Sequence, residues 1–166
     1  MERNQRPGMT VDPDGDAPDG GEAALRDAEE ILARAAADEA AADAARARYR
    51  SEPLPALPPD GRIGPLLLPD ERVVAVREHA QLERRQPAPG TRPPAGLAGA
   101  LYVTSRRLIL VGRVTLSYEL GAIGEAILAG ERLLLLLHDG QGLTLEVAQP
   151  RLLRVELTAA RAVAKV

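Results

Sequence analysis

The stretch Gly99-Ala-Leu-Tyr-Val-Thr-Ser-Arg-Arg-Leu-Ile-Leu-Val-Gly112 decides the fold class of this chain. It consists of two short apolar runs that are separated by Ser105 and Arg106 only. Because so short a connection leaves no room for a crossover helix, two strands joined in this way must be antiparallel. The stretch therefore predicts a hairpin of two strands, at 97–104 and 107–111.

Apolar runs of similar length lie on both sides of this hairpin. The alternation of Val114, Leu116 and Tyr118 with polar residues is typical of a half-buried strand. The leucine run 133–137 is ambiguous in its periodicity, but its length and its flanking glycines favour a strand buried on both faces. The further strands predicted are 73–82, 114–120, 125–128, 132–138 and 143–148.

The connections between these runs also predict hairpins. Gly112-Arg113 and Gly130-Glu131 have the Gly-X form of a type II′ turn, and Asp139-Gly140 suits type I′. The last segment, 150–166, would fit either a strand or a helix. We expect a helix, because proline suits a first helical turn and the segment is rich in alanine. Such a helix places Leu153, Leu157, Ala160 and Ala164 on one apolar stripe, which would cover an open end of the sheet.

About seven antiparallel strands followed by one helix predict a mainly β fold of the pleckstrin-homology type, a partly open barrel of curved sheets capped by a C-terminal helix. The hairpin at 99–112 resembles the second and third strands of GRAM and bacterial pleckstrin-homology-like domains. These domains often carry a hydrophobic-hydrophobic-Thr-x-x-Arg-hydrophobic-hydrophobic stretch. It is matched here by Tyr102, Val103, Thr104, Arg107, Leu108 and Ile109.

A second stretch supports the same resemblance, which covers about residues 66–164. Leu66 to Val74 resembles the opening Leu-x-x-Gly-Glu turn of the family, with Pro69-Asp70 where glycine is often found. The resemblance implies that Arg107 packs or pairs within the fold. It also implies that basic residues in the loop 83–97 could hold an anionic headgroup, and the candidates are Arg84, Arg85 and Arg92.

The chain before this domain divides into three parts. Residues 1–21, rich in Asp, Gly and Pro, predict a disordered acidic tail, because they cannot bury enough apolar surface to offset their ordering entropy. Residues 22–50 predict a helix, since they are rich in alanine and in Glu–Arg pairs at i,i+4 spacing. Residues 51–65 hold five prolines and predict a semi-rigid linker. Residues 66–166 then form the pleckstrin-homology/GRAM-like domain.

The predicted helix has only a narrow apolar stripe. Leu25 and Leu32 lie on it and Ile31 lies at its edge, but the stripe then meets Glu39 and Asp43. Three readings stay open: the helix docks on its own domain, pairs with a partner helix, or stands mostly in water.

Composition narrows the function further. The 166 residues include no cysteine, no tryptophan, no phenylalanine, three tyrosines and two histidines. This excludes disulfides, thiolate metal sites and cysteine nucleophiles, and it disfavours nucleic-acid binding, which needs aromatic stacking surfaces. Phosphate-binding loops and nucleophile elbows are missing too. We therefore expect a non-enzyme without cofactor or metal.

The charges are unevenly distributed: the first 65 residues carry 8 arginines against 14 acidic residues, and the remainder is mildly basic. With no signal peptide or spanning segment in the sequence, we expect a cytoplasmic protein that could be peripheral at a membrane. The leading hypothesis is an adaptor that binds a protein partner or itself through the domain and the helix face Leu25, Ile31 and Leu32. The alternative is anionic-lipid binding through Arg84, Arg85 and Arg92. A third reading is an enzyme with dispersed residues around His79 or His138.

Overall fold

In the computed structural model, which describes residues 20–85 and 96–164, the apolar runs form the predicted strands and the segment after them is helical. The elements are α1 (Gly20–Arg48), β1 (Val73–Arg85), β2 (Leu97–Thr104), β3 (Arg107–Gly112), β4 (Thr115–Glu119), β5 (Ile123–Ala129), β6 (Arg132–Leu137), β7 (Gly142–Glu146) and α2 (Pro150–Ala164). Single 3₁₀ turns at Gly64–Leu66 and Leu120–Ala122 precede β1 and β5.

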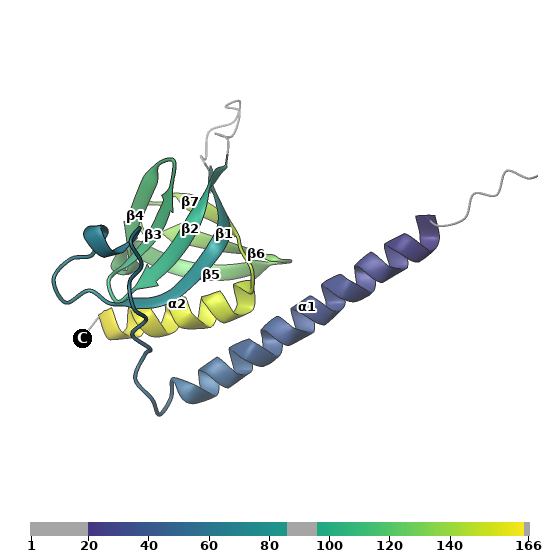
Figure 1. Ribbon diagram of the computed structural model, residues 1–166, viewed down its shortest axis with the longest axis horizontal. Helices are drawn as coiled ribbons and strands as arrows, with labels where there is room; N and C mark the ends of the chain where they lie inside the picture. Colours follow the sequence, from purple (N-terminus) through teal and green to yellow (C-terminus); the bar gives the residue numbers. More distant parts are fainter. Residues whose placement is uncertain (1–19, 86–95, 165–166) are drawn as a thin grey trace, which may run out of the picture. The chain divides into compact units, whose positions relative to one another are not determined.

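The strands form one antiparallel sheet in the order β4-β3-β2-β1-β7-β6-β5 (Figure 1). The 13-residue strand β1 is central, pairs with both β2 and β7, and is longer than predicted by three residues. Helix α2 packs against the strands and against the turn Leu120–Ala122, which joins the edge strands β4 and β5. This topology confirms the predicted fold class, a pleckstrin-homology-like sheet system with a C-terminal helix and an N-terminal helical arm.

The main core is aliphatic, as a chain with so few aromatic residues requires. Leucines of β1, β2, β3, β6 and β7 point inward, and Leu153, Leu157 and Ala160 of α2 close the core. These three helix residues are those of the predicted stripe, while the fourth, Ala164, is exposed at the end of the helix. Each fully buried leucine contributes about 1.5–3 kcal/mol relative to its exposed state, so this layer is the main source of stability.

The segment predicted as a linker packs on the other face of β1, β2 and β3. Leu57 pairs with Val73 in an isolated bridge, and Ile63 is completely buried in a second cluster with Tyr102 and Ile109. The hydroxyl of Tyr102 donates a 2.7 Å hydrogen bond to Asp60. Burial and this bond raise the pKa of Tyr102 to about 12.

Two of the three predicted turn types are wrong, and each has a local reason. Gly112 ends β3 without a positive φ, and a Cβ there would lie 2.1 Å from the carbonyl oxygen of Ala98. This glycine therefore permits close strand approach rather than a type II′ turn. At the β6–β7 turn Gly140 alone has a positive φ, which fits a type I turn followed by a left-handed residue. Gly130, with φ of 62°, fits the predicted type II′ turn.

The sequence predicts that β6, the leucine strand, is buried on both faces, but in the structure only one of its faces is buried. Leu133 and Leu135 are fully buried, but Leu136 on the opposite face is 43% exposed, and Ile127 of the neighbouring strand β5 is 37% exposed. The outer face of β5 and β6 therefore exposes apolar side chains to solvent.

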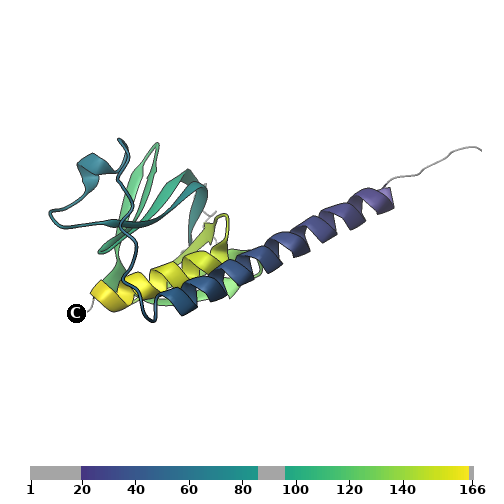
Figure 2. The ribbon, with the colours of Figure 1, turned by 60° about the horizontal axis from the view of Figure 1, so that its bottom comes forward.

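The chain divides into two compact units at Ala33, so the second part of α1, from Arg34 onward, belongs to the unit that contains the sheet. This part docks beside α2 (Figure 2). Ala42 and Ala45 are buried against Val155, so the small side chains permit close helix approach.

The carboxylate of Asp38 fixes the two helices together. One carboxylate oxygen accepts a 2.8 Å hydrogen bond from the amide of Arg151, and the other accepts a 3.0 Å bond from the amide of Leu152. These amides belong to the first turn of α2, and the N–H groups of a first turn have no hydrogen-bond acceptors within their own helix. Asp38 is therefore an N-cap supplied by another helix, and its negative charge lies at the positive end of the α2 dipole.

Replacing Asp38 with Ala should lower the free energy of unfolding by about 1–2 kcal/mol, because the first turn of α2 loses its cap. Hydrogen exchange should also quicken in α1 from Arg34 to Arg48, since the helices lose the two hydrogen bonds that Asp38 accepts from α2. The matched control is Asp43→Ala on the same helix, whose 68% exposed carboxylate pairs with Arg46 one turn away and not with α2. Urea unfolding of both variants measures the difference, and equal losses would contradict the capping role.

Candidate functional site

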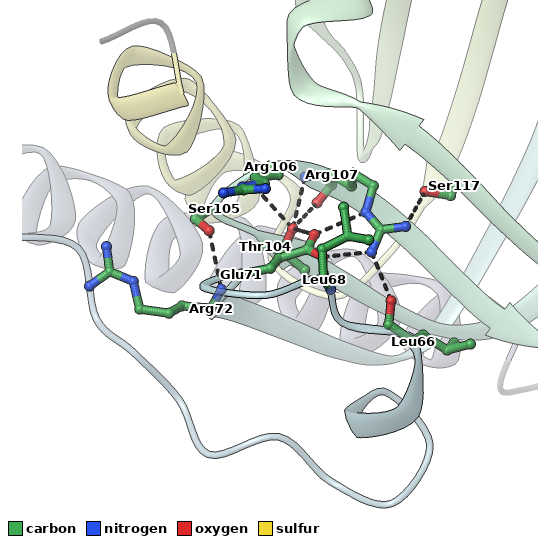
Figure 3. A network of polar contacts seen from close by, with 9 residues as sticks. All are labelled: Leu66, Leu68, Glu71, Arg72, Thr104, Ser105, Arg106, Arg107 and Ser117. Atoms are coloured by element: carbon green, nitrogen blue, oxygen red, sulfur yellow. Dashed lines mark hydrogen bonds and ion pairs between the residues drawn. The ribbon is translucent and has the colours of Figure 1, made fainter.

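The two stretches that carried the family resemblance meet in one buried polar network (Figure 3). Glu71, just before β1, has a fully buried side chain. Its carboxylate accepts hydrogen bonds from the Arg107 guanidinium at 3.0 and 2.6 Å, from the Thr104 hydroxyl at 2.6 Å and from the Leu68 amide at 2.8 Å. Both carboxylate oxygens are therefore satisfied, as a buried charge requires.

The turn that delivers Glu71 needs an unusual backbone conformation. Asp70 has φ of 63°, in the left-handed region. Glycine adopts this conformation most easily, and aspartate tolerates it better than most residues. Asp70 therefore adopts the left-handed conformation that a glycine would adopt most easily.

Thr104 and Arg107 complete the network from the turn between β2 and β3. The Thr104 hydroxyl oxygen accepts hydrogen bonds from the amides of Arg106 and Arg107 at 3.1 and 2.8 Å. Arg107 also donates a 2.8 Å bond to the carbonyl oxygen of Leu66. This confirms that Arg107 pairs within the fold; its charge is neutralised internally and is not offered to a ligand.

The network decides the protonation state of Glu71. Burial raises the pKa of this carboxyl, but the hydrogen bonds from Arg107, Leu68 and Thr104 outweigh burial and hold the pKa below its ordinary value. The same pairing raises the pKa of Arg107. Because the folded pKa of Glu71 is depressed, its stabilisation is present above the unfolded value and is lost as the pH falls through the folded value.

The residues predicted to contact an anionic headgroup lie at the far end of β1. Arg84 and Arg85 are both exposed, and the Arg84 Nε donates a 3.1 Å hydrogen bond to the Tyr118 hydroxyl. Arg85 is in register with Gly142, and Gly142 is in register with Leu136. Arg85 and the exposed Leu136 thus share one face of the sheet. Arg92 lies outside the described residues.

The predicted contact face of the N-terminal helix lies in the first part of α1. Leu25 and Leu32 are 66% and 69% exposed, and Ile31 at the edge of the stripe is 49% exposed. Of the three readings kept open from the sequence, docking on the domain describes the second part of α1 only. The first part presents its leucines to solvent.

An arginine-lined groove was not found by the sequence reasoning. It is an open groove of about 590 Å³ between the end of α1, α2 and Ala126 of β5. Arg46, Arg50 and Arg154 line it together with Tyr49, and its apolar part is formed by Val155, Ala159 and Ala162. Arg46 and Arg50 are four residues apart, but nothing in the sequence indicates that Arg154 lies near them.

The sequence also suggests His79 and His138 as centres of a dispersed site. His79 and His138 are both exposed. Within residues 20–85 and 96–164, no three His, Asp or Glu side chains are grouped closely enough to hold a metal ion. No helix in this part of the chain is long and apolar enough to cross a membrane.

Neither a protein-family model nor a curated protein sequence matches this chain. Among solved structures, the C-terminal domain of an unknown protein from Leishmania infantum is 14% identical, with a TM-score of 0.45 over 61% of this chain and 92% of that one. The Vps36 N-terminal PH domain is 16% identical, with a TM-score of 0.46 over 60% and 83%. The PH domain of USP37 is 16% identical, with a TM-score of 0.38 over 52% and 95%.

Replacing Glu71 with Gln should lower the free energy of unfolding by about 3 kcal/mol at neutral pH, because Arg107 is left without its buried counter-charge. As the pH falls through the depressed pKa of Glu71, the difference from the unaltered protein should shrink, because protonation removes the same charge that the substitution removes. The matched control is Glu78→Gln, which breaks the more exposed pair with Arg62 and should cost clearly less, because solvent screens that pair. Urea unfolding over this pH range tests this, and a pH-independent difference would contradict it.

Proposed function

We propose that this chain is a non-catalytic interaction module, in which the pleckstrin-homology-like domain holds an N-terminal helix whose first part binds a protein. The observation that carries the proposal is the contrast within α1. Its second part is tied to α2 by Asp38, while Leu25 and Leu32 on its first part are about two-thirds exposed. Large apolar side chains repeated on one side of a helix are the usual contacts of helix-in-groove recognition.

The chemistry of this helix face defines the partner surface. From Gly20 to Ala33 the helix carries four carboxylates and one arginine. Glu29 follows Leu25 by four residues and precedes Leu32 by three, so it lies on the same side of the helix as both leucines. The partner surface should therefore combine an apolar groove with positively charged walls.

The buried network also supports a finer family assignment. The Leu66–Val74 stretch and the Thr104–Arg107 stretch each resemble a separate part of GRAM and bacterial pleckstrin-homology-like domains. In the structure, Glu71 of the first stretch accepts hydrogen bonds from Thr104 and Arg107 of the second, so both stretches belong to one polar network. We propose on this basis that the domain belongs to that branch.

Site-specific photocrosslinking in the full chain tests the proposed binding. A photoreactive residue at position 32 should form a protein adduct, and Leu25→Gln should abolish it because the neighbouring apolar contact is lost. The same probe at position 27, on the opposite side of α1, is the matched control and should form none. Equal adduct yields at positions 27 and 32, or no adduct at 32, would contradict the proposal.

A second candidate function is contact with anionic lipid through Arg84, Arg85 and Arg92. It is supported by the position of Arg85 on the same sheet face as the exposed Leu136. A basic side chain beside an exposed aliphatic one suits a surface that rests on lipid headgroups.

Co-sedimentation of the full chain with phosphatidylserine vesicles tests this candidate. Binding should be present at low salt and weaken at high salt, since the attraction is electrostatic. Charge reversal at Arg84 and Arg85 should weaken it by about fivefold or more per residue, from the value of about 1 kcal/mol for each basic residue near the surface. Arg113→Glu, in the turn between β3 and β4, is the control, and lack of binding at low salt would exclude lipid as a ligand.

A further inference from the structure

The arginine groove has the properties that the first part of α1 requires of a partner. Its walls come from Arg46 in the last turn of α1, from Arg50 just after that helix and from Arg154 of α2, and no carboxylate of the described residues lines it. Its apolar lining consists of Val155, Ala159 and Ala162, of which the two alanines are the more accessible. The groove therefore offers positive charge beside apolar surface, which is the reverse of the acidic helix face.

Two of these arginines have no counter-charge within the described part of the chain. Arg46 pairs with Glu39 at 3.1 Å and with Asp43. By contrast, the guanidinium groups of Arg50 and Arg154 make no hydrogen bond or ion pair with residues 20–85 or 96–164. Their charges are available to carboxylates from outside, for which the guanidinium fork is well suited.

The matching helix face carries its charges at a regular spacing. Glu22 and Glu29 are seven residues apart, so both lie near the line of Leu25 and Leu32. Glu29 makes no ion pair with the described residues. Leu25 and Leu32 are separated by about 10 Å along the helix, since each residue adds about 1.5 Å. Two leucines flanking one carboxylate form a compact acidic and apolar contact.

We infer that this chain forms a homodimer in which the first part of α1 of each copy lies in the arginine groove of the other. The inference rests on the proposed function and names a second copy as the partner. Glu29 pairs with Arg154 and Arg50 across the contact, and Leu25 and Leu32 cover Ala159 and Ala162. A reciprocal exchange uses the same two surfaces twice, so a two-fold axis closes the assembly as a dimer.

Analytical ultracentrifugation of the full chain over a dilution series tests this dimer. Glu29→Arg alone and Arg154→Glu alone should each raise the dimer dissociation constant by about tenfold or more, because each substitution alters two contacts in a two-fold dimer. The double variant with both substitutions should dimerise again, since the charges are exchanged rather than removed. Asp27→Arg changes the charge equally on the opposite side of α1 and should leave the dimer intact.

Arg50→Glu provides a second groove variant, outside both helices, in case Arg154→Glu disturbs α2; circular dichroism checks the fold of each variant. A chain that is monomeric at every concentration would overturn the dimer, and so would a dimer unaffected by both single charge reversals. Failure of the double variant to restore association would overturn the Glu29–Arg154 contact. A monomer that still forms a position-32 adduct with another protein would leave the proposed function standing while removing the second copy as its partner.

Discussion

The buried carboxylate of Glu71 is the interaction on which the domain depends, because it joins the start of the sheet to the β2–β3 turn. A carboxylate without exposed surface is costly unless nearly all its hydrogen-bonding capacity is used. Here the Arg107 guanidinium, the Thr104 hydroxyl and the Leu68 amide donate the hydrogen bonds that the carboxylate requires. The charge pair fixes the geometry of the turn before β1, whereas the stabilising free energy comes mainly from the aliphatic core beneath it.

Asp38 applies the same principle to the helices. Its carboxylate is 4% exposed and accepts hydrogen bonds from two amides of α2. Asp38 thus caps the first turn of α2, although it lies within α1. The alanines around it allow the helices to approach closely, but small side chains bury little apolar area and would hold them only weakly. The docking of α1 on α2 therefore combines modest apolar contact with one well-placed charge. The docked part of α1 extends only as far as its alanine contacts with α2.

Elements with local signals could be predicted from the sequence, and contacts between distant residues could not. The alternation of apolar and polar residues around Leu116 is a local signal, and so is the proline at the start of α2. Both elements could therefore be predicted from neighbouring residues. The roles of Asp38 and of the arginine groove depend on residues more than 100 positions apart. Glu71 and Arg107 are an intermediate case. Each belongs to a stretch with a recognisable local pattern, but only the fold shows that the two side chains form a pair. The Gly112 turn was wrongly predicted because the close approach of β2 leaves no trace in the local sequence.

The charge distribution gains a structural meaning from these contacts. In the domain, most buried charges are neutralised at short range, by Glu71 with Arg107 and by Arg77 with Glu156 at 2.7 Å. Along α1 the charges separate instead, with carboxylates prevailing on its first part and arginines at its end. This distribution stabilises α1 itself, because carboxylates lie toward the positive end of the helix macrodipole while Arg46 and Arg48 lie in the last turn, at its negative end. It also distinguishes the two ends of the helix to a binding partner, because carboxylates at one end and guanidinium groups at the other favour antiparallel over parallel contact. One charge distribution therefore fits both the stability of the helix and the recognition proposed for it.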